Sequence, residues 1–133
     1  MTTPVISISE LSRRSGVSPH TLRYYEKAAV LAPVARASNG HRSYLASDVA
    51  WLAFVLRLKA TGMPLAEIKQ YAALRSQGDM TVPQRLAVLE HHRERLVTTM
   101  QALSHNLAAL DDKIGLYRRS LQPTRKPPRK PKP

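Results

Sequence analysis

The stretch "ISISELSRRSGVSPHTLRYYEKAAVL", residues 6 to 31, decides the fold, because it contains two helix starts separated by a tight turn. The first start is "SISE", Ser7 to Glu10, which has the spacing of a capping box. In that motif a serine oxygen and a glutamate three residues later satisfy each other's free backbone amides. We therefore predict a short helix over about residues 8–14, followed by a turn at Gly16.

The second start is Ser18-Pro19, an N-cap residue followed by a proline at the first helical position. It predicts a helix over about residues 19–27. Two helices joined by a glycine-containing turn form the helix-turn-helix pattern of many DNA-binding proteins. On the second helix we expect Leu22 to face the core. The outward side is expected to carry His20, Thr21, Arg23 and Tyr25, a combination that favours DNA reading over a merely solvated face.

A β-hairpin follows in "VARASNGHRSY", residues 34 to 44. Asn39-Gly40 suits the two positive-φ positions of a type I′ turn. The two strands are expected to expose Arg36, His41, Arg42 and Tyr44. Two strands alone are marginal in water, so this ribbon needs a purpose other than building a sheet.

Two further helices are expected before Gly78. One runs over about residues 47–61, with Ser47 as a possible cap and Gly62 as its stop, and a shorter one lies within "PLAEIKQYAALRSQG". Trp51 and Phe54 have the helical spacing of core aromatics. Residues 1–78 should therefore form one compact four-helix unit with a hairpin.

A heptad pattern marks the next segment, which should be a helix of roughly 57 Å over residues 82–119, with Thr81 as cap and Gln84 in the reciprocal position. Its seam is Val82, Leu86, Leu89, Arg93, Leu96, Met100, Leu103, Leu107, Leu110, Ile114, Tyr117 and Leu121. A second copy of the chain is the simplest partner for it, giving a homodimer. The alternative folds the helix back on its own domain. Arg93 either fixes register or lies in solvent, or else it contacts an anion or ligand.

The composition points to a polyanionic partner. Lys and Arg number 21 against 9 acidic residues, a net charge of +12, which favours nucleic acid first and an acidic membrane surface second. Residues 122–133 are rich in proline, lysine and arginine and are expected to be disordered, as a solubilising end or as a nucleic-acid arm. No secretion signal or long apolar run is visible, so a cytoplasmic location is expected, and the absence of cysteine excludes disulfides and thiolate metal sites.

Together, "ISISELSRRSGVSPHTLRYYEKAAVL", "NGHRSY" and "LKATGMPLAEI" resemble the MerR family of bacterial transcription regulators. The resemblance implies a mainly α fold: a winged helix-turn-helix head over residues 1–78, with the hairpin as the wing, and a long antiparallel coiled-coil dimerisation helix over 79–121. The family's recognition-helix contacts to base edges or phosphate match Arg23 and Tyr25, and His20 and Thr21 occupy its variable positions. The wing arginine, its supporting aromatic and a second phosphate contact match Arg42, Tyr44 and Lys59.

This chain departs from the family pattern at three positions. Ala29 replaces a glycine after the recognition helix and must either accept positive φ or shift the turn. His41 replaces an aromatic residue in the wing. Pro64 stands where a serine or threonine cap is common, so the start of that helix is less clearly marked.

The function expected from these features is a homodimeric, sequence-specific transcription regulator that bends and untwists promoter DNA for RNA polymerase. An architectural or excisionase-like DNA-binding protein is the alternative. We expect no enzyme, because nucleophile, base and acid spacings are absent, and no cofactor. The histidines His91, His92 and His105 are interpreted as solvated surface, with an inter-chain metal site as the weaker reading. A small-molecule effector, if one exists, would have to bind between the long helix and the head.

Overall fold

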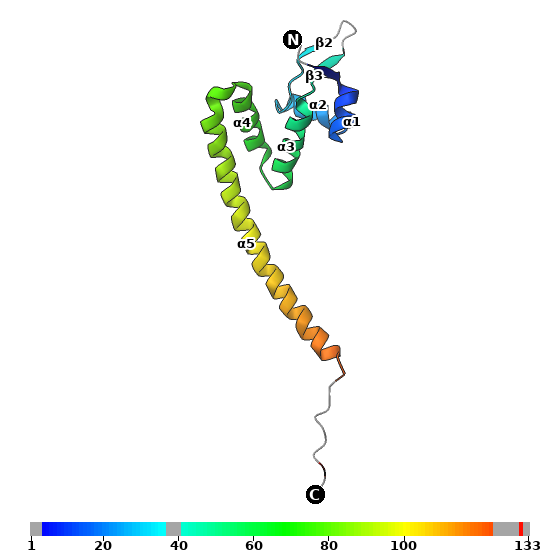
Figure 1. Cartoon of the computed structure of the whole chain (residues 1–133), viewed down its shortest axis with the longest axis vertical. Helices are drawn as coiled ribbons and strands as arrows, with labels where there is room; N and C mark the ends of the chain where they lie inside the picture. The colour runs from blue at the N-terminus through cyan, green and yellow to red at the C-terminus, as the bar shows by residue number, and fades with distance from the viewer. Residues whose placement is uncertain (1–3, 37–40, 124–130, 132–133) are drawn as a thin grey trace. The chain divides into compact units, whose positions relative to one another are not determined.

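The computed structural model describes residues 4–36, 41–123 and 131, and its contacts divide the chain into two compact units, Met1–Leu96 and Val97–Pro133. Most of the basic tail and the Asn39-Gly40 turn therefore lie outside the described residues. The elements are β1 Val5–Ser7, α1 Ile8–Ser15, α2 Pro19–Lys27, β2 Ala35–Arg36, β3 Arg42–Leu45, α3 Asp48–Ala60, α4 Leu65–Ser76, the 3₁₀ helix η1 Asp79–Thr81, and α5 Val82–Leu121. Figure 1 labels all of them except β1 and η1.

Both predicted serine N-cap bonds of the helix-turn-helix are confirmed, but the reciprocal half of the predicted capping box is not, because the Glu10 carboxylate binds Arg13 and Arg14. The Ser7 hydroxyl accepts a hydrogen bond from the Glu10 amide, and the Ser18 hydroxyl accepts one from the Thr21 amide, each at 3.1 Å. Gly16 ends α1 in the left-handed conformation with φ 74°, a value that glycine adopts without a steric penalty. These local signals place α2 at its predicted bounds, Pro19–Lys27.

The hairpin is confirmed by antiparallel pairing of β2 with β3, but a third strand joins it. The strand order is β1-β3-β2, and β1 pairs Val5 with Leu45. On the other side of β3, Ala35 pairs with Ser43, whereas an unbroken ladder from a two-residue turn at Asn39-Gly40 would pair Ala35 with Tyr44. Strand β1 therefore covers the edge of β3 that lies opposite β2.

The core of the head gathers side chains from all of its helices. Leu11, Leu22, Leu52 and Val55 are fully buried. Trp51, predicted to be core, donates its indole N–H to the Val30 carbonyl at 2.8 Å and stacks on Tyr71, with ring centroids 5.8 Å apart. Because a buried indole needs an acceptor, this bond fixes α3 against the turn after α2.

Ala29 adopts φ 61°, so the chain accepts positive φ at this position and the turn is not shifted. The amides of Val30 and Leu31 both donate to the Tyr25 carbonyl, which closes the end of α2. A left-handed alanine costs about 1 kcal/mol relative to an ordinary conformation. The turn that ends α2 is therefore strained, and tertiary packing keeps Ala29 in this conformation.

Two predicted caps are wrong. Ser47 makes no side-chain cap bond at α3, and the Asp48 carboxylate accepts from the Leu45 amide at 3.1 Å instead. Burial raises the pKa of Asp48, while the Leu45 hydrogen bond opposes that rise. Thr81 is buried within η1, where its hydroxyl bonds the carbonyls of Leu74 and Gly78. It therefore closes the end of α4 and does not cap α5.

The first part of α5, residues 82–96, packs into the head. Leu89, predicted for the dimer seam, contacts the core of its own head, because α5 crosses next to α4. His92, predicted to be solvated, is buried, with its Nε2 2.8 Å from the Thr61 hydroxyl. Arg95 donates to Glu67 on α4 at 2.6 Å. The compact unit thus extends past residue 78, where the sequence pattern places the end of the head.

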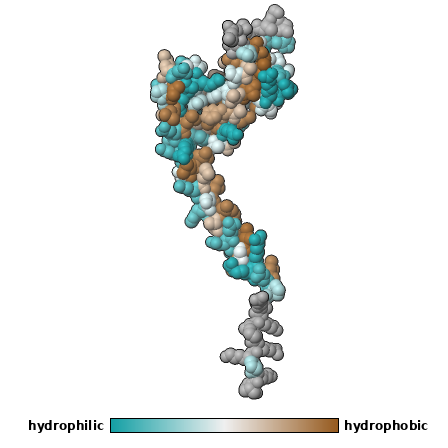
Figure 2. Space-filling model, viewed as in Figure 1, coloured by the Kyte–Doolittle hydropathy of each residue, from teal (hydrophilic) through white to brown (hydrophobic). Residues whose placement is uncertain are grey.

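The rest of α5 belongs to the second unit and presents an apolar stripe. Five aliphatic seam residues before Tyr117 leave between 45% and 61% of their surface exposed, and Figure 2 shows hydrophobic side chains recurring along the helix. These residues are Met100, Leu103, Leu107, Leu110 and Ile114. Within the described part of the chain, no helix combines the length and apolar character that a membrane crossing requires.

Candidate nucleic-acid interface

The exposed side of α2 carries His20, Arg23 and Tyr24. Thr21 is half-buried, because its amide and hydroxyl both take part in the Ser18 cap. Lys27, in the last turn, is exposed as well, so this side presents an imidazole, two cations and one phenol from a capped helix. Such groups can donate hydrogen bonds to base edges or phosphate.

The predicted outward position of Tyr25 is wrong. Only 3% of its surface is exposed, whereas its neighbour Tyr24 is 51% exposed. Residues three apart lie on the same helix face, so Tyr25 shares the buried side with Leu22. That spacing was readable in the sequence and identifies Tyr24 as the outward tyrosine.

Glu26 joins α2 to the wing. Its carboxylate accepts from Arg42 at 2.6 Å and from the Tyr44 hydroxyl at 3.1 Å. Tyr44 is fully buried, so the prediction that it is exposed in the ribbon is wrong. Burial is the main cause that raises the pKa of Tyr44, and its hydrogen bond to Glu26 raises this pKa further. Its position fits the predicted supporting role, and about a third of the Arg42 side chain remains exposed.

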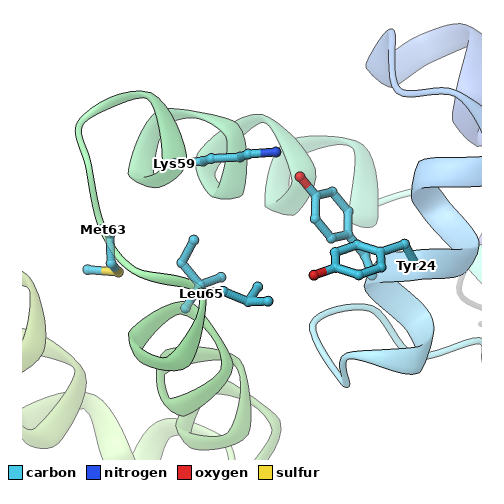
Figure 3. Close-up of a pocket in the computed structure, with 6 residues that line it drawn as sticks. Tyr24, Lys59, Met63 and Leu65 are labelled. Carbon is cyan, nitrogen blue, oxygen red and sulfur yellow. The ribbon is translucent and has the colours of Figure 1, made fainter.

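Lys59 lies exposed in the last turn of α3, where a cation is favoured by the helix dipole. It lines the same cavity as Tyr24, as Figure 3 shows. The structure thus brings the predicted phosphate-binding lysine next to the recognition helix. The sequence contains no signal for this proximity, since the two residues belong to different helices and meet only through the fold.

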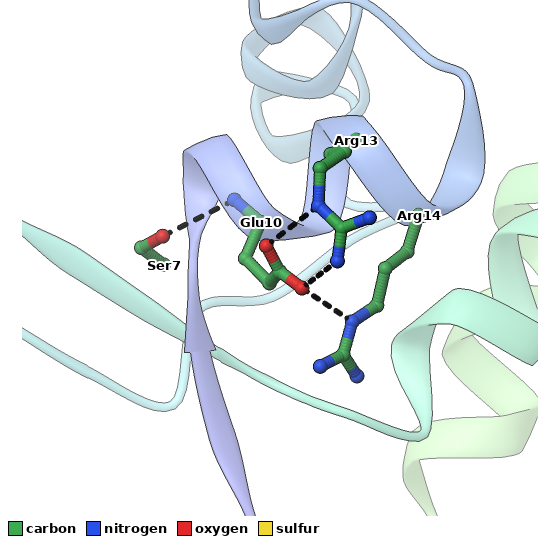
Figure 4. A network of polar contacts seen from close by, with 4 residues as sticks. All are labelled: Ser7, Glu10, Arg13 and Arg14. Carbon is green, nitrogen blue, oxygen red and sulfur yellow. Dashed lines mark hydrogen bonds and ion pairs between the residues drawn. The ribbon is translucent and has the colours of Figure 1, made fainter.

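A second polar cluster, which the sequence analysis did not predict, lies on α1 (Figure 4). The Glu10 carboxylate binds Arg13 and Arg14 together, with Arg14 Nε at 2.7 Å. These hydrogen bonds lower the pKa of Glu10 from 4.5 to about 2. The three side chains carry one net positive charge and hold the two guanidinium groups in a fixed orientation. The spacing of three and four residues along a helix could have indicated it.

The histidines do not assemble a metal site within the described ranges 4–36, 41–123 and 131, where no group of three or more potential ligands is found. His91 is exposed and His92 is buried, so the adjacent pair diverges as predicted from their helical positions. Arg95 also approaches the Nδ1 of His92, at 3.5 Å. His92 therefore serves as a packing and hydrogen-bonding residue at the base of α5.

Comparison with known proteins agrees with this arrangement. The family model for the "MerR HTH family regulatory protein" matches residues 6–74, and the "MerR, DNA binding" model matches residues 49–113. An uncharacterized HTH-type transcriptional regulator of Haemophilus influenzae is 31% identical over 112 residues, covering 84% of this chain and 83% of that protein.

Two solved structures are similar over most of the chain. The crystal structure of HiNmlR, a MerR family regulator lacking the sensor domain and bound to promoter DNA, has a TM-score of 0.74 and 30% identity, covering 88% of this chain and 93% of that one. A MerR family transcriptional regulator from Listeria monocytogenes has a TM-score of 0.78 and 32% identity, covering 85% and 86%. The likeness thus includes both the head and much of α5.

Proposed function

The chain belongs to the MerR family of DNA-binding transcription regulators, and from that premise we propose that it acts as a homodimer that places two winged heads on the two halves of one promoter site. It is not an enzyme, since the family consists of transcription regulators. The observation that carries the proposal is the Glu26 bridge. This carboxylate binds Arg42 of the wing from within the recognition helix, so an ion pair joins the two proposed DNA-facing elements of each head.

Within each head, we assign base reading to the outer side of α2, through His20, Arg23 and Tyr24. Phosphate contact is assigned to Arg42 and Lys59, which flank that side from the wing and from the end of α3. Thr21 contributes through the cap that orients the first turn of α2. Tyr44 and Tyr25 act indirectly, by supporting the wing and the helix from inside the core.

The apolar stripe of α5 supports an antiparallel dimer. A helix of this length with half-exposed leucines along one seam gains stability when a second seam covers it. Two-fold symmetry lets the same seam of both copies pair, so that when residue i of one copy contacts residue j of the other, residue j of the first also contacts residue i of the second. Two rigid heads held at a fixed separation can impose a bend or untwist on the intervening DNA, and deformable sequences then bind better without direct contact. Bending and untwisting would allow RNA polymerase to engage both promoter elements.

The proposal is tested by measuring DNA affinity over a range of salt concentrations. Arg23→Ala is expected to weaken the preferred site more than random DNA, because base contacts carry sequence information. Lys59→Ala should weaken both DNAs alike and reduce the slope of log affinity against log salt by up to about 0.9. Arg118→Ala, which removes one cation from the last turn of α5, is the charge-matched control.

Equal losses on both DNAs for Arg23→Ala would reassign that residue to the DNA backbone. Mapping bound sites across the genome separates a promoter regulator from an architectural DNA-binding protein. Enrichment at promoters, with altered transcription on deletion of the gene, is the expected result. Binding that is spread without regard to promoters would contradict the proposed regulation while leaving DNA binding intact.

A further inference from the structure

A cavity of about 210 Å³ lies within the head, between α2, the end of α3 and the start of α4 (Figure 3). It is larger than an engineered apolar cavity of roughly 150 Å³ that holds benzene. Its walls are mainly apolar, and its volume suits a ligand of one ring with a small substituent. The lining residues are Tyr24, Tyr25, Lys59, Met63, Leu65 and Ile68.

The lining provides both aromatic and sulfur contacts for a ring. Two tyrosines and Met63 border the same space, and aromatic faces and thioether sulfur both pack favourably against aromatic ligands. Leu65 and Ile68 complete the apolar wall from the first turn of α4. A flat apolar body is therefore preferred over a sugar or another polyhydroxylated molecule.

One lining residue carries a polar group with an unmet hydrogen-bonding requirement. The Tyr25 hydroxyl is buried and has no hydrogen-bond partner in the described structure. Buried hydroxyl groups in proteins are nearly always paired, so a small shift of the Tyr25 side chain toward the cavity would gain a hydrogen bond to a bound acceptor. A carboxylate oxygen is a strong acceptor for a phenol.

Two further features, a lysine and a helix N-terminus, give this cavity a positive electrostatic potential. Lys59 borders it and carries an ammonium group. Leu65 is the first residue of α4, and the preceding residue, Pro64, has no side chain that could cap the free amides there. A helix N-terminus carries a partial positive charge and favours an anion. Lys59, the uncapped start of α4 and the Tyr25 hydroxyl thus favour one negative group.

We propose that this cavity binds a small aromatic carboxylate, with the ring against Met63, Leu65 and Ile68 and the carboxylate toward Lys59 and the Tyr25 hydroxyl. The regulatory consequence rests on the proposed function. Tyr24 and Lys59 also belong to the assigned DNA-binding side, so an occupied cavity withdraws them from DNA. The ligand therefore lowers DNA affinity, and DNA lowers ligand affinity by the same factor.

The direct test uses the full chain without DNA. Benzoate is titrated while backbone amide shifts are followed by NMR, and saturable shifts at the lining residues are expected, with a dissociation constant in the millimolar range for so small a ligand. Benzyl alcohol, which keeps the ring without the charge, should bind roughly tenfold more weakly. Acetate and inorganic phosphate, which lack the ring, should not produce saturable amide shifts at the lining residues. Phosphate binding as tight as benzoate would overturn the proposal and identify a backbone-phosphate site.

Four variants locate the site. Lys59→Gln should weaken benzoate but not benzyl alcohol, and Tyr25→Phe should weaken benzoate while leaving the melting temperature unchanged or higher. Leu65→Trp should fill the cavity and abolish the binding of both benzoate and benzyl alcohol. Lys69→Gln, an exposed lysine of α4 outside the lining, is the matched control and should bind benzoate like the wild type. Unchanged benzoate binding in Leu65→Trp, or an absence of saturable shifts in the wild type, would overturn the inference.

The regulatory step is measured separately. Benzoate should reduce DNA affinity of the wild type and have no effect on a correctly folded Leu65→Trp protein. Benzoate binding in a protein that fails to bind any DNA would leave the cavity assignment standing and refute the proposed function. DNA binding without benzoate binding would refute the cavity assignment and leave the proposed function standing.

Discussion

Arg42 of the wing and Glu26 of the recognition helix form an ion pair at 2.6 Å, and the Glu26 carboxylate also accepts from the buried Tyr44 hydroxyl. The two elements expected to contact DNA are therefore linked by an ion pair in the DNA-free protein. A carboxylate on a DNA-facing element would ordinarily repel phosphate. Here it is largely buried, and it fixes the geometry of the arginine that lies beside it.

Glu26→Ala should lower the free energy of unfolding by about 2 kcal/mol, because it leaves the Tyr44 hydroxyl and the Arg42 guanidinium without their acceptor. Urea denaturation measures the loss. Combining Glu26→Ala with Tyr44→Phe in a double-mutant cycle isolates the hydroxyl contact. Strict additivity of the two single changes would show that this contact contributes nothing.

The two adjacent tyrosines give a matched pair. Tyr24→Ala should weaken DNA binding by about tenfold with little effect on stability, since the side chain is half-exposed. Tyr25→Phe should leave DNA binding and stability nearly unchanged, because the hydroxyl it removes is unpaired. Fluorescence anisotropy with labelled operator DNA and thermal melting measure the two effects. A larger loss of DNA affinity in Tyr25→Phe than in Tyr24→Ala would contradict the assignment.

Ala29→Gly should stabilise the head by about 1 kcal/mol, because glycine adopts positive φ without the penalty that alanine meets. The control is Ala53→Gly, at an exposed position in the middle of α3, which should destabilise by a similar amount. Equilibrium unfolding of both variants provides the comparison. Destabilisation by both would mean that Ala29 is not strained.

Leu103→Arg should raise the dimer dissociation constant by roughly a hundredfold or more, because a charge would be buried in the seam without a partner. Leu116→Arg is the matched control, since Leu116 lies on the same helix with similar exposure but off the seam. Sedimentation equilibrium measures both. A wild type that is already monomeric at micromolar concentration would refute the proposed dimer.

Glu10 should make stability depend on pH in acid. Its pKa is lowered from 4.5 to about 2 by Arg13 and Arg14, so its favourable contribution is present above pH 4.5 and is lost as the pH falls from 4.5 through 2. The difference in unfolding free energy between wild type and Glu10→Gln should therefore shrink across that window, and it should shrink with added salt. Glu90→Gln, which removes an exposed carboxylate from α5, is the control. A Glu10 that titrates near 4.5 by NMR would contradict the ion-pair network.

Much of the fold was predictable because it depends on neighbours three or four residues apart. The caps at Ser7 and Ser18, the bounds of α2 and the wing hairpin were predicted and are confirmed. The two predicted caps that failed, Ser47 and Thr81, show the limit of such rules. Ser47 occupies the N-cap position of α3, but the Val49 amide bonds the Ala46 carbonyl instead of the serine side chain, and the Thr81 hydroxyl bonds carbonyl groups at the end of α4.

The sequence by itself determined the family, the order of the five helices and the hairpin, the basic character and the heptad seam, because these depend on composition, spacing and local hydrogen bonding. It did not reveal strand β1. Only the tertiary structure decided that Tyr44 reaches Glu26 18 positions away and that His92 meets Thr61 31 positions away. It alone assembled the cavity from three helices. Such contacts join residues that are distant in the chain, and their geometry is fixed by how whole helices pack, a constraint that no short stretch of sequence contains.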